Sequence, residues 1–173
     1  MRLFNKVAVI GTGLIGGSLA LVIKKRKLAK EVVGVASHKS SLDLALKNKV
    51  IDQGALSLNI IKGADLLIMS TPVDAIIGLR KEILKYVNSD CIVMDVGSTK
   101  EKIVSFLERD FPNYVGSHPL AGSEKRGVTH AYAGIFKDSL CLLTPTAKTS
   151  VEAIKKNKGI MEKGRGRNYL FNP

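Results

Sequence analysis

The first residues whose types and spacing could do chemistry stand in a glycine-rich turn near the amino terminus. Gly11, Gly13 and Gly16 form the pattern G-x-G-x-x-G, between an apolar run at 6–10 and a segment with helical spacing at 14–25. In such a strand–turn–helix unit the glycines permit the tight turn, the approach of backbone N–H groups to a pyrophosphate, and close helix packing. The helix also presents its positive end to the phosphates. The turn predicts a dinucleotide site formed by Gly11, Gly13, Leu14, Ile15 and Gly16; a glycine turn without a ligand is the alternative.

The end of the next apolar run, 31–35, should face the ribose of the same dinucleotide. NAD sites usually place a carboxylate there, for the 2′-hydroxyl. This sequence instead has Ser37, His38 and Lys39 after Ala36. A hydroxyl, an imidazole and an ammonium suit a 2′-phosphate better than a carboxylate would, so the segment favours NADP over NAD. A solvated loop is the other interpretation of these three residues.

Polar residues follow three further apolar runs. Ser70, Thr71 and Pro72 come after the run at 66–69, and we expect them to contact the cofactor; simple strand-end residues are the alternative. The segment Asp95-Val-Gly-Ser-Thr-Lys100 follows a run at 91–95, and Gly116-Ser-His-Pro-Leu-Ala-Gly-Ser-Glu124 follows another at 114–116. Open α/β sheets bind ligands at the carboxyl ends of their strands, where these segments should meet.

Together with the glycine turn, these segments resemble the prephenate and arogenate dehydrogenases of tyrosine biosynthesis, over roughly residues 3–146. The run around His118 is the most specific part of the resemblance. It implies a small-molecule substrate, prephenate or arogenate, and its oxidative decarboxylation with NADP or NAD. A ring carbon gives a hydride to nicotinamide, the hydroxyl loses its proton, and CO₂ leaves as the ring becomes aromatic. The resemblance implies no metal.

The resemblance also assigns roles to three residues. His118 matches the histidine that faces the substrate hydroxyl, and a neutral imidazole is a suitable proton acceptor. Ser98 matches the serine that orients this histidine or touches the hydroxyl, and Glu124 matches an acid near the substrate entrance. The plainer alternatives are a loop histidine at His118 and a helix N-cap at Ser98.

Short apolar strands alternate with helical segments along the chain, a pattern typical of a parallel sheet covered on both faces. We therefore expect an α/β fold, a doubly wound Rossmann-type mostly parallel sheet in a single dinucleotide-binding domain at 1–148. The strand at 140–143 should be the last.

Residues 149–173 should be a truncated helical start, at 151–158, followed by a basic tail that Gly164 and Gly166 interrupt. The codons of Met161 and Glu162 contain a Trp codon in a shifted reading frame. The codons that follow permit, in that frame, a series of residues like the one that the prephenate and arogenate dehydrogenases have at this place. We therefore expect a frameshift near 159–161, with no evolved fold from about residue 161 onward; a naturally short protein is the alternative. Full-length family members continue into a helical part that forms a homodimer.

Composition restricts the other classes of function. The net charge is +12, but the basic residues are scattered without interleaved aromatic residues, so a solvated basic surface is favoured over nucleic-acid binding. No apolar run is long enough to cross a membrane. Cys91 and Cys141 lie in apolar runs without metal-ligand spacing, which predicts buried, reduced thiols and a cytoplasmic protein.

Two rival functions keep the same fold. A β-hydroxyacid dehydrogenase or an imine reductase would share the glycine turn, although neither is expected to carry the run around His118. A non-catalytic dinucleotide-binding module would need the glycine turn alone.

Overall fold

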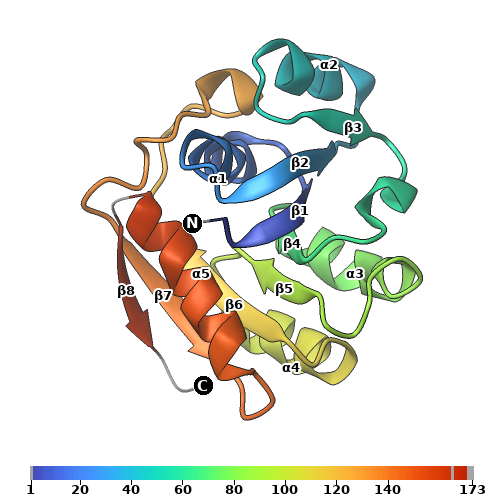
Figure 1. The fold of residues 1–173 in the computed structure, drawn as a ribbon, viewed down its shortest axis with the longest axis vertical. Coiled ribbons are helices and arrows are strands. Elements are labelled where there is room, and N and C mark those ends of the chain that lie inside the picture. Colours follow the sequence, from blue (N-terminus) through green and yellow to red (C-terminus); the bar gives the residue numbers. More distant parts are fainter. Residues whose placement is uncertain (1, 165, 171–173) are drawn as a thin grey trace.

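The computed structural model describes residues 2–164 and 166–170. Strands and helices alternate along most of the chain (Figure 1). The strands are β1 (Phe4–Ile10), β2 (Ala29–Val35), β3 (Gln53–Ala55), β4 (Leu66–Met69), β5 (Ile92–Asp95), β6 (Tyr114–Pro119), β7 (Leu140–Pro145) and β8 (Arg167–Leu170). The α-helices are α1 (Leu14–Lys25), α2 (Lys39–Lys47), α3 (Val73–Ile83), α4 (Lys100–Asp110) and α5 (Val151–Lys163), and short 3-10 helices are η1 (Leu58–Ile61) and η2 (Val128–His130).

The strands form one sheet in the order β3-β2-β1-β4-β5-β6-β7-β8. All neighbours pair in parallel except β6 and β7, which are antiparallel. The chain starts in the middle of the sheet and winds outward in both directions, so the direction of the strand order reverses between the neighbouring strands β1 and β4 (Figure 1). This arrangement confirms the predicted doubly wound α/β fold.

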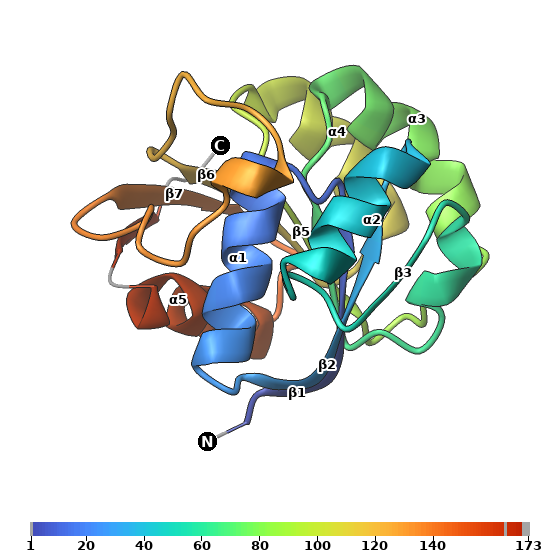
Figure 2. The ribbon, with the colours of Figure 1, turned by 90° about the horizontal axis from the view of Figure 1, so that it is seen from above.

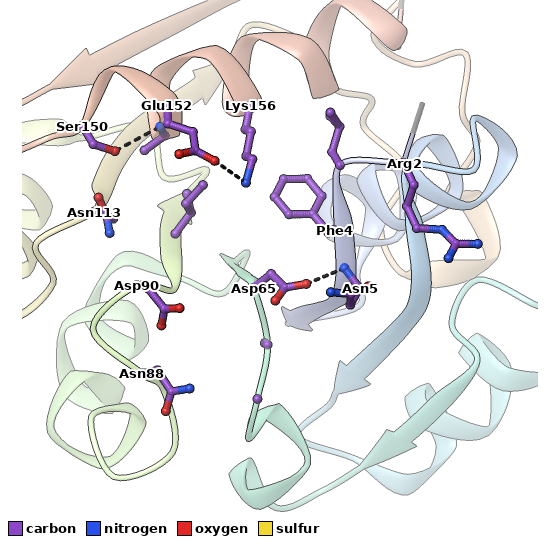
Figure 3. Close-up of a pocket in the computed structure, with 15 residues that line it drawn as sticks. Arg2, Phe4, Asn5, Asp65, Asn88, Asp90, Asn113, Ser150, Glu152 and Lys156 are labelled. Atoms are coloured by element: carbon purple, nitrogen blue, oxygen red, sulfur yellow. Dashed lines mark hydrogen bonds and ion pairs between the residues drawn. The ribbon is translucent and has the colours of Figure 1, made fainter.

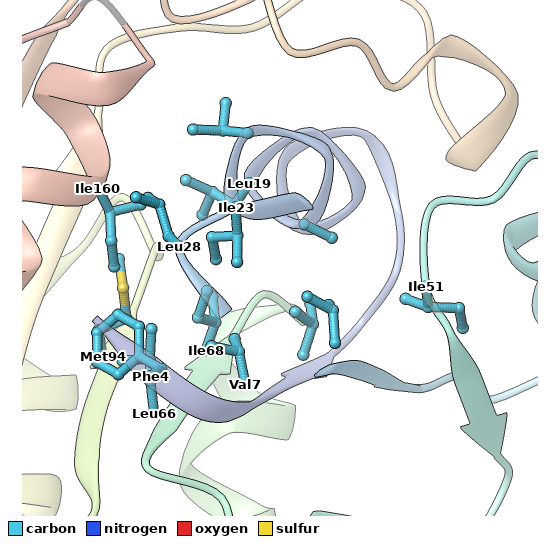
Figure 4. Packing of buried hydrophobic residues seen from close by; sticks show 14 of the residues in the cluster. Phe4, Val7, Leu19, Ile23, Leu28, Ile51, Leu66, Ile68, Met94 and Ile160 are labelled. Carbon is cyan, nitrogen blue, oxygen red and sulfur yellow. The ribbon is translucent and has the colours of Figure 1, made fainter. Parts of the chain in front are cut away.

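Two apolar cores lie on the two faces of the sheet. Figure 2 shows α5 beside α1, and α3 beside α4. One core joins the sheet to α1, α2 and α5; there Leu19 and Ile23 pack over Val7 and Ile68, with Ile160 from α5 alongside (Figure 4). The other core joins the sheet to η1, α3 and α4. Burial on both faces explains why the central strands are continuously apolar.

Several elements differ from the expectations. β6 continues to Pro119, three residues beyond the predicted end, because Ser117, His118 and Pro119 pair with β7. His118 therefore lies on a strand and not in a loop. α2 begins one residue earlier than expected and has His38 at its N-cap. The short strands β3 and β8 lack a clear apolar run and were not predicted.

The end of the chain differs most. α5 runs to Lys163, five residues past the expected helical start, and β8 pairs in parallel with β7, which is therefore not the last strand. Ala153, Ile160 and Met161 are fully buried, at the i, i+7, i+8 spacing of one helix face. The expectation that residues from about 161 have no fold is thus not met. A frameshift in the gene stays a prediction, and an early stop codon in the shifted frame would contradict it.

Both cysteines are free and buried, as the apolar runs predicted. Burial raises the pKa of each thiol to about 12, so neither is a reactive thiolate. Among the described residues, no helix combines the length and apolar character that a membrane span requires.

Candidate active site

The glycine turn joins β1 to α1 at the carboxyl edge of the sheet. Gly11 has φ +90°, a conformation that favours glycine, and its amide donates to the Val35 carbonyl at 2.9 Å. A Cβ at Gly11 would lie 2.7 Å from the carbonyl carbon of Ser70. One at Gly16 would lie 2.9 Å from the Ser70 Cβ. These two glycines therefore let the turn and α1 pack against the end of β4.

Gly13 is different because a Cβ there would meet no atom within 4 Å. It is the N-cap of α1, and no side chain caps the helix. The amide groups of the first turn consequently face open space with the positive end of the helix dipole. That open space is where a pyrophosphate would approach.

Two buried hydroxyls also fit a polar ligand beside the turn. The Oγ1 atoms of Thr12 and Thr71 are buried and have no hydrogen-bond partner among the described residues. Buried polar atoms normally have partners. The uncapped helix, the open position at Gly13 and these hydroxyls together fit a bound dinucleotide.

A cavity of about 360 Å³ continues from the turn along the ends of β1, β2 and β4. The structure here brings together predicted residues from three parts of the chain: Gly11, Ser37, Thr71 and Pro72. Apolar side chains of Leu56, Leu58 and Leu79 complete its wall. Ser70 packs directly beneath the turn, where its amide donates to the Ile10 carbonyl at 2.8 Å.

Ser37, His38 and Lys39 are all exposed at the end of β2. The Lys39 ammonium pairs with Asp43 at 2.8 Å, one helical turn further along α2. Both partners are mostly exposed, so this ion pair is worth little and can be exchanged for another anion. Of these three residues only Ser37 lines the cavity, and the one acidic residue in that lining is Glu82 from α3.

His118 lies on β6 opposite Leu142 and is partly exposed. Burial lowers its pKa from the usual value, the positive charge of Lys100 lowers it further, and Asp95 opposes the shift. The neutral imidazole is therefore favoured near pH 7, and neutral imidazole is the form that accepts a proton.

A buried charged cluster that the sequence reasoning did not single out lies at the end of β5. Asp95 is fully buried and accepts hydrogen bonds from the Tyr114 hydroxyl at 2.6 Å and from the Gly97 amide at 2.7 Å. The Lys100 ammonium pairs with the same carboxylate. The sequence does contain a signal for this cluster, because the acidic Asp95 ends an apolar strand and the basic Lys100 follows five residues later.

Ser98 and Glu124 are both exposed. Ser98 is in a bend beside the Asp95 cluster, and the N-cap of α4 is Thr99, so the N-cap alternative for Ser98 is wrong by one residue. Glu124 lies in the irregular segment after β6. Neither residue has a side-chain hydrogen bond among the described contacts.

A larger hollow of about 680 Å³ lies at the opposite edge of the sheet (Figure 3). It opens among the amino ends of β1 and β5 and the start of α5, where Lys156 pairs with Glu152. It contains none of the predicted site residues. Its place at the amino ends of the strands separates it from the ligand edge of the fold.

Comparison with known proteins identifies the chain's relatives. Residues 19–170 match the family model described as prephenate dehydrogenase, nucleotide-binding domain. The chain belongs to this family. Prephenate dehydrogenase from Bacillus subtilis is 35% identical over 163 residues, which cover 91% of this chain and 44% of that protein. Cyclohexadienyl dehydrogenase from Zymomonas mobilis is 31% identical, over 89% of this chain and 54% of that protein.

Solved structures of the prephenate dehydrogenase family superpose on nearly the whole chain. Prephenate dehydrogenase from A. aeolicus, in complex with hydroxyphenyl propionate and NAD⁺, gives a TM-score of 0.93 at 29% identity, covering 98% of this chain and 60% of that one. Arogenate dehydrogenase from Synechocystis gives 0.92 at 27% identity, covering 97% and 60%. The chain spans about half the length of the curated relatives it matches.

Proposed function

We propose that this chain is the cofactor-binding part of an NAD(P)-dependent prephenate or arogenate dehydrogenase. The observation that carries the proposal is the common edge where the glycine turn, the open α1 amino end and the half-buried His118 all lie. The family relationship and the relative solved with NAD⁺ support the same function.

The cofactor role falls to the glycine turn and its surroundings. The α1 amides and Gly11, Gly13, Leu14, Ile15 and Gly16 hold the pyrophosphate. Thr71 and Pro72 line the cavity beyond the turn, Ser70 lies beneath the turn, and we assign all three to contacts with the rest of the dinucleotide. The nicotinamide ring, when bound, accepts a hydride. Thr12 and Thr71 each offer an unpaired hydroxyl to this ligand.

His118 takes the proton of the substrate hydroxyl, because its environment keeps the imidazole neutral. Ser98 stands exposed at the next strand end, where it can orient the imidazole or touch the hydroxyl. Glu124 stays assigned to the substrate entrance. The remaining length of the relatives, absent from this chain, would complete the substrate site and the homodimer. The buried, unpaired cysteines support a cytoplasmic location.

NADP is the proposed cofactor. Support comes from Ser37 at the cavity wall, His38 at the α2 N-cap and the exchangeable Lys39–Asp43 pair. A Ser37→Asp variant restores the carboxylate typical of NAD sites, and we expect it to lower the ratio of NADP to NAD affinity at least about tenfold. An unchanged ratio would contradict the assignment of Ser37 to the 2′-phosphate.

The activity is tested by following reduced cofactor with prephenate, arogenate and a series of 3-hydroxy acids. We expect at most weak turnover with prephenate or arogenate, because the part of the relatives that would complete the substrate site is absent from this chain. That turnover should fall by about 10²–10⁴-fold in His118→Asn, the usual contribution of a general base. A surface control, Lys102→Met, should retain the activity.

Two other outcomes would identify the rival functions. Turnover with 3-hydroxy acids and none with prephenate or arogenate would indicate a β-hydroxyacid dehydrogenase. Undiminished cofactor binding, together with a His118→Asn variant that changes no measured activity, would indicate a non-catalytic dinucleotide-binding module.

A further inference from the structure

The cavity beside the glycine turn has two apolar sides and one charged group. Leu56 and Leu58, from the segment after β3, bound one side, while Ala75 and Leu79 of α3 bound the other. Because β2 and β1 lie between β3 and β4 in the sheet, these two sides come from different flanks of the cavity. Among the described residues that line it, Glu82 of α3 is the one with a charged side chain.

The position of Glu82 on α3 places it at one end of this cavity. Ala75, Leu79 and Glu82 are separated by four and three residues, so they share one helix face. Ten residues separate Glu82 from the N-cap Pro72, a rise of about 15 Å along the helix. Helical side chains lean toward the amino end of their helix, which here is the end beside the glycine turn. Glu82 therefore borders the part of the cavity farther from the turn, with its carboxylate directed back along α3.

The Glu82 carboxylate is available to a ligand. Its side chain is exposed, and it makes no ion pair or side-chain hydrogen bond within the described ranges 2–164 and 166–170. An ionised carboxylate can only accept hydrogen bonds. A ligand group that binds Glu82 must consequently be a donor.

The apolar sides of the cavity fit a flat ring. Leu56 is 54% exposed, and the Leu79 side chain is only partly buried. A ring inserted between them would remove apolar surface from water on both sides. The volume of about 360 Å³, with apolar sides and few polar groups, is typical of a pocket for a small ligand or a cofactor.

The proposed placement of the dinucleotide decides which ring this is. The pyrophosphate lies at the α1 amino end and the adjoining ribose lies by Ser37, so the base extends farther into the cavity. The exocyclic amino group of adenine is a hydrogen-bond donor. We infer that Glu82 is a specificity-determining residue that accepts a hydrogen bond from this amino group while Leu56 and Leu79 flank the ring. The inference rests on the proposed function, in which the cavity holds the cofactor.

The test is a calorimetric titration of the complete chain with NADP and with its hypoxanthine analogue, in which a carbonyl oxygen replaces the amino group. NAD and its hypoxanthine analogue form a second pair. We expect the unmodified chain to bind the adenine dinucleotide about 5–20-fold more tightly, since the carboxylate accepts from the amino group and repels the carbonyl oxygen. The amide of Glu82→Gln can accept from the one or donate to the other, so the two Kd values should come within about twofold. Glu82→Ala should abolish the preference as well.

A matched control is Glu162→Gln, which removes an exposed carboxylate on α5 outside the cavity. It changes the net charge equally and should keep the preference for adenine. Because Glu82 is exposed, its variants should keep the fold, and Tm without cofactor checks this.

Equal Kd values for the adenine and hypoxanthine dinucleotides in the unmodified chain would overturn the inference. So would a full preference for adenine in Glu82→Ala. A folded chain that binds neither dinucleotide of a pair would instead contradict the proposed function, and the inference with it. The two failures are therefore distinguished by whether the adenine dinucleotide binds at all.

Discussion

Substitution by alanine should have different effects at two glycines of the same turn. At Gly11 the new side chain meets the backbone of Ser70, and φ is +90°. At Gly13 the new side chain meets nothing within 4 Å, and φ is −71°. We therefore predict that Gly11→Ala damages the fold, whereas Gly13→Ala leaves the fold intact and damages only cofactor binding.

The magnitudes follow from the geometry. A left-handed backbone conformation costs a non-glycine residue about 1–2 kcal/mol. The Cβ would sit 2.7 Å from the Ser70 carbonyl carbon, about 1 Å closer than a normal carbon contact, and such overpacking costs about 1–3 kcal/mol. The sum of about 2–5 kcal/mol corresponds to a fall in Tm of about 4–20 °C for a chain of this size.

Gly13→Ala should cost only about 0.5 kcal/mol as a change of N-cap residue, which lowers Tm by about 1–2 °C. Its methyl group nevertheless occupies the open space in front of the α1 amides. We expect Kd for the cofactor to rise at least about tenfold, or about 1.4 kcal/mol.

Thermal unfolding and calorimetric titration of both variants check these values. Equal losses of Tm in the two variants would refute the packing argument. Cofactor binding by Gly13→Ala that matches the unmodified chain would refute the placement of the pyrophosphate.

Three further changes test other parts of the structure. At Gly78, on the exposed face of α3, a Cβ would meet no atom within 4 Å. Gly78→Ala should therefore raise the free energy of unfolding by about 0.5–1 kcal/mol, measured as a higher Tm. A lower Tm would mean that the new methyl group is not accommodated there. Met161→Ala removes a fully buried side chain and should cost about 2–5 kcal/mol in denaturant unfolding; no change would mean that residues from 161 onward are not part of the core. The pKa of His118 is lower in the folded chain than its unfolded value near 6.5, so between these values the unfolded chain binds more protons and stability rises with pH. The stability that the neutral His118 imidazole contributes is lost as pH falls from about 6.5 toward the pKa of the folded chain. In His118→Gln this titration is absent, so Tm should rise less steeply with pH through the same window.

Much of the fold could be predicted because its signals are local. The strand β4 and the helix α1 have the bounds that apolar periodicity predicted, since each depends on a continuous apolar run or a single helix face. The extension of β6 to Pro119 could not be read in the same way. It depends on pairing with β7, more than twenty residues later in the chain. Likewise, α3 ends at Ile83 although apolar residues continue to Val87, because the chain turns there.

The candidate site shows the same division. The glycine turn could be predicted from the spacing of its glycines alone. The structure brings Ser37 and Thr71 to the cavity beside the turn, as expected for residues at strand ends on the same edge of the sheet. The Asp95–Tyr114 bond could not be foreseen, because these residues are nineteen positions apart and one of them appeared to be an ordinary apolar strand residue. The unpaired hydroxyl of Thr12 likewise depends on three-dimensional burial and on no sequence pattern.

The most direct test of the central claim is a calorimetric titration of the intact chain with NADP and, separately, with NAD. We expect saturable binding with Kd in the micromolar range, tighter for NADP, and a matching rise in Tm when the cofactor is present. Failure of a folded chain to bind either dinucleotide would contradict the proposed cofactor site, since the glycine turn would then have only a structural role.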